Sequence, residues 1–228
     1  MAEYDDWEYA VNLFRQKRTG KQYISLYSIP CFDNIEGIIG FADAYKNVWS
    51  INDLAMQVRM NKEGFFDAKN GDGFGRIAEV DYEANVKYLV EIFVDLNSKT
   101  YSVYITPDGG EKALIAENFA FSTTSGGFAY LGQAFFISDQ SDSFIADTLN
   151  VLEVYDPLKT YYSTGENMGW QDQGIYLGRE YNGKVKISWD MTVLIDEAQT
   201  IVAFTDKEFP VFGFGDLAML VRTNLGTA

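Results

Sequence analysis

Three carboxylates alternate with two apolar residues in the segment Glu79-Val80-Asp81-Tyr82-Glu83. On an extended strand all three lie on one face, with Glu79 and Glu83 about 13 Å apart at roughly 3.3 Å per residue. Two carboxylates can act as nucleophile and acid/base in retaining glycoside hydrolysis, if strand curvature brings them to about 5–5.5 Å. Such a pattern is also easy to meet in a chain with 33 acidic residues. We therefore expect no catalytic residue and keep this pair as an alternative.

A second group of residues could hold a sugar. Tyr45 and Trp49 precede a strand on which Gln57, Arg59 and Asn61 share one face. Aromatic rings can stack on a sugar ring, and planar polar groups can take hydroxyls in pairs. We expect these five residues to bind a ligand. In the alternative, Trp49 caps the core edge and Arg59 pairs with a carboxylate on a neighbouring strand.

A third group could hold a cation. Asp67, Asn70 and Asp72 offer side-chain oxygens of the kind that calcium prefers. Asn-Gly and Asp-Gly pairs are also ordinary turn sequences, and the spacing is not that of an EF-hand loop. Calcium is the one cofactor that the sequence suggests, and we expect none to be required.

Composition excludes several kinds of site and partner. The chain contains no His, so histidine-based triads and zinc sites with His ligands are excluded. Its single Cys cannot form an internal disulfide. The formal net charge of −15 repels nucleic acids, anionic membrane surfaces and, unless a cation bridges the two, acidic polysaccharides such as pectate. We expect no nucleic-acid or membrane partner.

We expect no targeting or membrane signal within this chain. It has no run of about 18 apolar residues that could span a bilayer. Its first residues, Met1-Ala2-Glu3-Tyr4-Asp5-Asp6, lack the basic start and apolar stretch of a signal peptide. The protein is therefore either intracellular or a module of a longer secreted chain.

Period-two alternation predicts an all-β fold. Residues 86–95 and 100–106 alternate apolar and polar side chains on both sides of a short loop at 96–99, which predicts a hairpin. Short strands with turn signals about every ten residues indicate an antiparallel sandwich or barrel. The segment 6–17 has only mild helical spacing and is expected to be irregular or a strand. Further strands are expected at 22–29, 37–42, 54–61, 64–67, 112–117, 128–137 and 148–154.

The chain matches itself at an offset of 163 residues. Asp53-Leu54-Ala55-Met56-Gln57-Val58-Arg59 returns as Asp216-Leu217-Ala218-Met219-Leu220-Val221-Arg222, and 16 of the 42 positions from Gly20 to Asn61 are identical in this register. Phe212 stands where Trp49 stands, which favours packing at that position.

The repeat predicts two modules in tandem. Residues 1–160 form a complete sandwich, and residues 161–228 form a partial second copy. A half sandwich leaves an apolar face and an open edge. We expect the chain to be a fragment of a longer protein; the alternatives are that residues 165–228 pack on the first module or pair with another chain, which would cause self-association.

Several segments of residues 20–154 carry a family resemblance. They are Ile35–Ala42, Asp53–Asn61, Phe66–Gly71, Tyr82–Tyr88 and above all Lys99-Thr100-Tyr101-Ser102-Val103-Tyr104-Ile105-Thr106-Pro107-Asp108-Gly109-Gly110. Together they resemble the concanavalin-like or laminin-G-like jelly-roll accessory modules of bacterial polysaccharide-degrading proteins. The resemblance implies a jelly-roll sandwich and non-catalytic carbohydrate binding outside the cell, although such sandwiches host many roles.

The acidic segment has a resemblance of its own. Its Glu-x-Asp-x-Glu pattern is similar to the strand of laminarinase-type retaining β-glucanases, which implies Glu79 as nucleophile and Glu83 as acid/base, but the flanking residues do not match that family. We therefore expect a non-catalytic carbohydrate-binding or adhesion module of an extracellular or cell-surface bacterial protein. The alternatives are a retaining β-glucanase-type hydrolase and a structural or assembly β-sandwich.

Overall fold

The computed structural model describes residues 7–139, 143–154, 175–176, 201–204 and 219–222. The chain divides into two compact units, Met1–Val154 and Tyr155–Ala228. None of the described helices has the length and hydropathy needed to cross a membrane.

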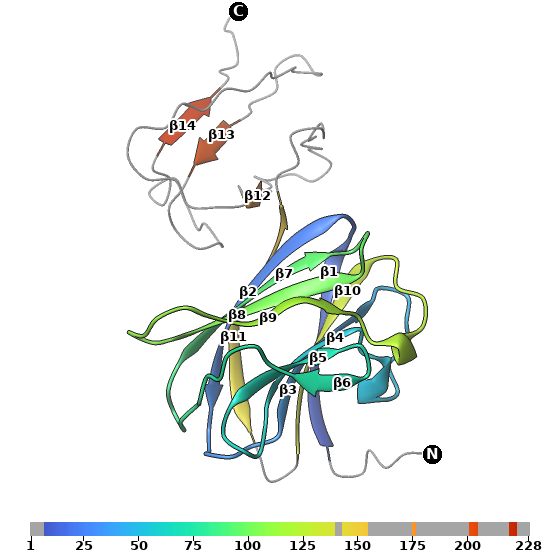
Figure 1. Cartoon of the computed structure of the whole chain (residues 1–228). Coiled ribbons are helices and arrows are strands. Elements are labelled where there is room, and N and C mark those ends of the chain that lie inside the picture. The colour runs from blue at the N-terminus through green and yellow to red at the C-terminus, as the bar shows by residue number, and fades with distance from the viewer. Residues whose placement is uncertain (1–6, 140–142, 155–174, 177–200, 205–218, 223–228) are drawn as a thin grey trace, which may run out of the picture. The chain divides into compact units, whose positions relative to one another are not determined.

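The first unit is an antiparallel β-sandwich of two sheets (Figure 1). The first sheet has the strand order β1-β10-β3-β4-β5-β6. Neighbouring strands such as β1 and β10 are far apart in sequence, as in a jelly roll. The bounds of its strands are β1 Trp7–Arg18, β3 Gly37–Asp43, β4 Met56–Met60, β5 Phe66–Asn70, β6 Gly73–Gly75 and β10 Leu131–Asp139.

The second sheet packs on the first. Within the first unit its strand order is β11-β2-β7-β8-β9. Short 3-10 helices lie at Ile51–Asp53 (η1) and Thr123–Ser125 (η2). The bounds of the strands are β2 Lys21–Pro30, β7 Tyr88–Asp95, β8 Thr100–Pro107, β9 Ala113–Ala120 and β11 Phe144–Val154.

The main core lies between the two sheets. The inward faces of the predicted hairpin, β7 and β8, supply Tyr88, Val90, Ile92, Val94, Tyr101, Val103 and Ile105, all buried in that core. Alternate residues of β3 and β4 oppose them, including Phe41, Met56 and Val58. The antiparallel sandwich expected from period-two alternation is therefore confirmed, and so is the jelly roll that the family resemblance implied.

One tyrosine reaches from the second sheet to the backbone of the first. The Tyr101 side chain is 1% exposed. Its hydroxyl lies within hydrogen-bond distance of the Lys69 carbonyl oxygen and 3.1 Å from that of Gln57. The ladder between β4 and β5 runs from Met60 to Val58. The hydroxyl therefore lies between β4 and β5 just beyond the end of their ladder, and its hydrogen bonds link both backbones to β8.

A second apolar cluster covers the outer face of the first sheet. Ile38, Ala42, Leu54, Phe135 and Ile137 are buried there, and the loop residues Val48 and Ile51 pack against them. The loop 44–55 thus folds back over the sheet. Leu54 approaches so closely that a Cβ on Gly40 would lie 2.4 Å from its Cδ1 atom. The strand expected at 54–61 would put Leu54 on the same face as Met56, which is wrong because β4 begins only at Met56.

The second unit has strands at Ile175–Tyr176 (β12), Ile201–Phe204 (β13) and Met219–Arg222 (β14). β13 pairs antiparallel with β14, from Ile201 opposite Arg222 to Phe204 opposite Met219. Subtracting 163 from these numbers gives Ile38 opposite Arg59 and Phe41 opposite Met56, which are partners in β3 and β4. The backbone pairing is thus the one that the internal repeat predicts, and the extent of a second module remains a prediction.

Candidate functional site

The structure separates the five residues predicted to bind a ligand. Tyr45 and Trp49 lie in the loop after β3, beside the start of β4. Arg59 and Asn61 lie at the other end of β4. Gln57 lies between these places, fully buried. The sheet therefore presents two candidate surfaces.

The first surface consists of exposed aromatic rings. Tyr45 is 67% exposed and Trp49 is 77% exposed. Tyr130, which precedes β10, is 37% exposed and lies edge-on to Tyr45, with 5.8 Å between ring centroids. We call Tyr45, Trp49 and Tyr130 the ring surface. The exposure of Trp49 contradicts the alternative in which it caps the core edge.

Hydrogen bonds fix the two segments that carry these rings. The Asp43 carboxylate accepts from the backbone N–H groups of Tyr45, Ala129 and Tyr130 at 2.7–2.9 Å. The Gln133 side-chain amide donates to the carbonyl oxygens of Asp43 and Lys46 at 2.7 and 2.8 Å. Both segments are therefore held to β3 and β10.

Lys46 and Asp53 complete this network. The Lys46 ammonium lies 3.0 Å from the Asp53 carboxylate and donates to the Ser125 carbonyl oxygen, which ties the loop to η2. The Asp53 carboxylate also accepts from the Trp49 backbone N–H at 2.9 Å. Burial alone would raise the pKa of Asp53, but these bonds outweigh it and lower the pKa below its ordinary value. Asp53 therefore stays charged at neutral pH.

Gln57 cannot reach a ligand where it stands. The loop 44–55 lies over it, and its Nε2 donates to the Ile51 carbonyl oxygen at 2.7 Å. Its side chain therefore anchors the loop to the sheet.

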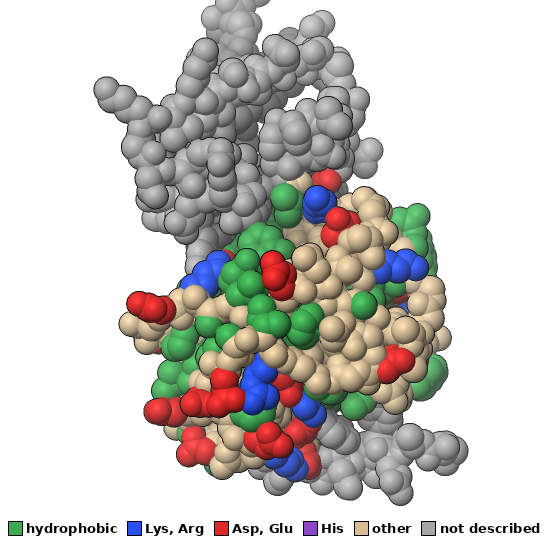
Figure 2. Space-filling model, viewed as in Figure 1, with side chains coloured by type: hydrophobic (Ala, Val, Ile, Leu, Met, Phe, Trp, Pro, Cys, Tyr) green, Lys and Arg blue, Asp and Glu red, His purple; other side chains and the backbone are tan. Residues whose placement is uncertain are grey.

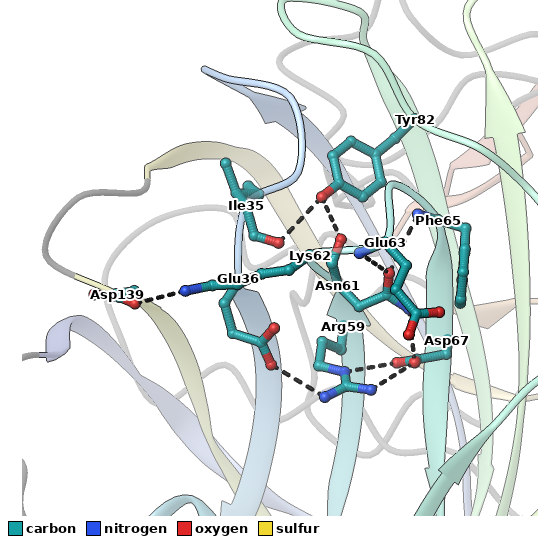
Figure 3. Close-up of polar contacts among 10 residues, drawn as sticks. All are labelled: Ile35, Glu36, Arg59, Asn61, Lys62, Glu63, Phe65, Asp67, Tyr82 and Asp139. Atoms are coloured by element: carbon teal, nitrogen blue, oxygen red, sulfur yellow. Dashed lines mark hydrogen bonds and ion pairs between the residues drawn. The ribbon is translucent and has the colours of Figure 1, made fainter.

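Arg59 is the centre of the second surface (Figure 3). Its Nε and Nη2 donate to both oxygens of Asp67 at 2.9 and 2.7 Å, and its Nη1 donates to Glu36 at 3.1 Å. Burial lowers the pKa of Arg59, but the bonds and charges of Asp67 and Glu36 raise it above its ordinary value. The alternative, that Arg59 pairs with a carboxylate on a neighbouring strand, is confirmed. Its side chain is still 23% exposed.

Arg59 forms one wall of a hollow of about 250 Å³ on the outside of β4, β5 and β6. The Arg59 guanidinium also lies over the Phe74 ring, 3.8 Å from its centroid. The Arg76 guanidinium stacks on the Phe65 ring in the same way, at 3.5 Å. The hollow is lined by Glu36, Arg59, Asn61, Lys62, Glu63, Phe65, Asp67, Phe74, Gly75 and Arg76.

Asn61 organises the floor of this hollow. Its Nδ2 donates to Asp67 at 2.9 Å, and its Oδ1 accepts from the backbone N–H groups of Glu63 and Phe65 (Figure 3). Asn61 is buried, at 5% exposure. It fixes the turn between β4 and β5, and the hollow opens above that turn.

The three residues predicted to bind calcium have separate partners. Asp67 accepts from Arg59 and Asn61. The Asn70 side-chain oxygen accepts from the Ala120 backbone N–H at 3.0 Å, and Asp72 accepts from the backbone and hydroxyl of Thr123. The segment forms the β5–β6 turn, with Gly71 at φ +59°. Among the described residues, no three acidic, Cys or His side chains gather as a metal site would require.

The acidic segment is only partly the strand that the sequence suggested. Val80 and Tyr82 are buried and the carboxylates of the segment are exposed, as the alternation predicts. However, the only pairing that the structure describes here is an isolated bridge between Asp81 and Phe65. Glu79 forms an ion pair with Arg76. Neither Glu79 nor Glu83 lines the hollow.

Sequence reasoning missed Tyr130, Phe74 and the anchors Asp43 and Gln133. Tyr130 joins Tyr45 only because β10 pairs with β3. Phe74 meets Arg59 only because β6 adds to the edge of β5. Such pairings between distant segments leave no local signal, whereas the exposure of Tyr45 and Trp49 follows from their place in a loop.

Comparison with known proteins gives one sequence relative. No family model matches the chain. It is 24% identical over 181 residues to a gellan lyase from Bacillus sp, a match that covers 76% of this chain and 7% of that protein. The chain thus spans a small part of this relative's length. This match to a polysaccharide-degrading protein confirms the resemblance to modules of such proteins.

The solved structures that are similar include a sialidase and two lectins. The sialidase has a TM-score of 0.47 at 14% identity, covering 65% of this chain and 14% of that one. Peanut lectin has a TM-score of 0.44 at 13% identity, and the match covers 65% of this chain and 83% of the lectin. Lectin II from Ulex europaeus has a TM-score of 0.45 at 8% identity, and the match covers 65% of this chain and 82% of the lectin. These likenesses concern the fold alone.

Proposed function

We propose that the chain is a non-catalytic glycan-binding module of an extracellular protein, and that it binds through the ring surface. The observation that carries the proposal is the exposure of Tyr45 and Trp49, at 67% and 77%. Exposed apolar side chains that gather in one patch are a feature of binding surfaces, and Tyr45 and Trp49 lie in one loop. Flat rings suit the C–H faces of sugars.

The support around the rings favours binding over chance exposure. Asp43, Gln133, Lys46 and Asp53 fix the backbone beneath the rings in the free protein. A ligand therefore does not have to bear the entropy of ordering this loop, and preorganisation of this kind raises affinity.

The comparisons and the charge of the chain supply further support. The relative is by its name an enzyme that acts on gellan. The match covers 7% of that protein, a share suited to an accessory module of a larger enzyme. The net charge of −15 favours neutral glycans over anionic ones.

The test is binding of defined glycans to the full chain and to single variants. Laminarihexaose and cellohexaose are titrated by calorimetry, and gellan and pectate are tested by affinity electrophoresis. We expect Trp49→Ala to weaken binding of the glycan that the wild type binds by at least about tenfold, or about 1.4 kcal/mol. Lys46→Met should weaken binding less than Trp49→Ala does, because it loosens the loop but removes none of the rings.

The matched control is Phe32→Ala, since Phe32 is an aromatic residue 55% exposed outside the ring surface. New reducing ends are measured in the same mixtures, and none are expected. Equal affinities for Trp49→Ala and Phe32→Ala would show that the ring surface is not the binding site. Release of reducing ends that is lost in Glu79→Gln would establish hydrolysis instead.

A further inference from the structure

The hollow beside Arg59 lies apart from the ring surface, and none of its lining residues belongs to that surface. The two are separated along β4, whose first residue pairs with Phe41 and whose last pairs with Gly37. Two of its lining residues are held by the fold, since the side chains of Asp67 and Arg59 are 5% and 23% exposed. Lys62, Glu63 and Arg76, which also line it, are exposed.

The charges around the hollow are balanced. Arg59, Lys62 and Arg76 are cationic, and Glu36, Glu63 and Asp67 are anionic. Each cation already has a carboxylate partner: Arg59 pairs with Asp67 and Glu36, Lys62 with Asp139, and Arg76 with Glu79. Acidic and basic side chains lie next to each other in the lower part of the first unit (Figure 2). An anionic ligand would have to displace a carboxylate, so the hollow favours a neutral one.

Hydrogen-bonding capacity remains in the hollow. A guanidinium has five N–H donors. Three of those on Arg59 bond to Asp67 and Glu36, which leaves two for a ligand. The Asn61 amide donates one N–H to Asp67 and has a second. These planar donors, with Phe65 and Phe74 as apolar walls, match the mixture of hydroxyl groups and C–H faces on a sugar.

We propose that this hollow is a second glycan subsite, which binds one neutral sugar unit through Arg59 and Asn61. The proposal rests on the proposed glycan-binding function, but it concerns different residues. It also defines the ligand class more narrowly, because uronic and sulfated units are excluded by the balanced charges.

One wall of the hollow allows a test that leaves the ion pairs intact. Phe74 lines the hollow, and its ring lies against the Arg59 guanidinium. Phe74→Ala should therefore remove the apolar wall on which a sugar would pack. Its matched control is Phe32→Ala, because Phe32 is an exposed aromatic residue that does not line the hollow.

The readout is the NMR signal of the Arg59 Nε–H group and the Asn61 side-chain amide. The full chain is titrated with the methyl glycosides of glucose, galactose, mannose and rhamnose, and with methyl glucuronide. We expect saturable shifts of both signals with at least one neutral glycoside in the wild type and in Phe32→Ala, and at least tenfold weaker binding in Phe74→Ala. Methyl glucuronide should bind more weakly than the neutral glucoside.

The outcomes separate the two proposals. Three results would overturn the subsite: Arg59 and Asn61 signals that do not move with any glycoside, equal affinities of Phe74→Ala and Phe32→Ala, or tighter binding of the glucuronide than of the glucoside. The ring surface would still stand if hexasaccharide binding depends on Trp49. Conversely, saturable Arg59 shifts together with Trp49-independent binding of the hexasaccharides would retain the subsite and overturn the ring surface.

Discussion

Replacement of Tyr101 by Phe should remove the link between the two sheets at the point where β4 and β5 part. The change deletes only the hydroxyl and leaves the ring in the core. Two buried carbonyl oxygens, of Gln57 and Lys69, then lose a donor, and the Gln57 N–H loses an acceptor at 3.5 Å. A buried polar group left without a partner costs about 1–3 kcal/mol. Because one hydroxyl hydrogen serves both carbonyls, we expect a total loss of about 2–3 kcal/mol in the free energy of unfolding.

Urea unfolding of the full chain, followed by far-ultraviolet circular dichroism, measures this loss. The midpoint should fall while the slope stays unchanged, because the surface exposed on unfolding is the same. In a thermal scan the loss corresponds to a fall of roughly 5–10 °C for a unit of this size. The matched control is Tyr104→Phe, on the same strand, for whose hydroxyl the described structure shows no hydrogen bond. Its midpoint should stay at the wild-type value.

Alkaline pH supplies an independent check. Burial raises the pKa of Tyr101 above that of an exposed tyrosine, against the hydrogen bonds of Gln57 and Lys69. The unfolded chain therefore ionises this residue first, near pH 10. The stability from the protonated hydroxyl is fully present below that pH and is lost as the pH rises above it. The difference between wild type and Tyr101→Phe should shrink above about pH 10. A Tyr101→Phe protein as stable as Tyr104→Phe would refute the cross-sheet link.

Three further predictions follow from the loops and turns. Glycan binding should weaken as the pH falls through the lowered pKa of Asp53, because protonation of Asp53 releases the loop under the rings. Calorimetry at a series of pH values measures this change. Binding that stays the same in acid would contradict the prediction. Gly132→Ala places a Cβ 2.5 Å from the Ala44 Cα atom, so thermal unfolding should show a loss of about 1–3 kcal/mol in the free energy of unfolding. Gly127→Ala should show no such loss, because no heavy atom lies within 4 Å of a Cβ there. Calcium or a chelator should leave the unfolding temperature unchanged, because Asp67 and Asp72 already accept hydrogen bonds; a rise with calcium would reveal a site.

The hairpin of β7 and β8 could be predicted from sequence because one of its faces is wholly apolar and meets the core, whereas the other mixes polar residues with Leu89 and Phe93. Where other residues cover both faces of a strand, alternation predicted the wrong environment for a side chain. Gln57 alternates with Met56 and Val58 as a surface residue would, yet the loop 44–55 buries it. No local pattern states that a loop will return over a sheet.

Strand ends were harder to predict than strands. The last strand of the first unit was expected to begin at residue 148, but β11 begins at Phe144. Thr148 has a φ of +54°, at a shift of register between Asp147 and Asn150. The irregularity resembles a turn in sequence, whereas the pairing with β2 continues on both sides of it. The candidate site was divided for a similar reason, because alternation gives the face of a residue but not its distance along the sheet.

The apolar roof of Val48, Ile51 and Leu54 has a consequence for the length of the ligand. It covers part of the outer face, so a sugar chain that used both proposed surfaces would have to pass it. A chain that reaches both sides gains avidity, because its first contact raises the effective concentration of the second. A short oligosaccharide gains nothing in this way. Stiff polymers whose repeat matches the width of the roof would be favoured over flexible ones.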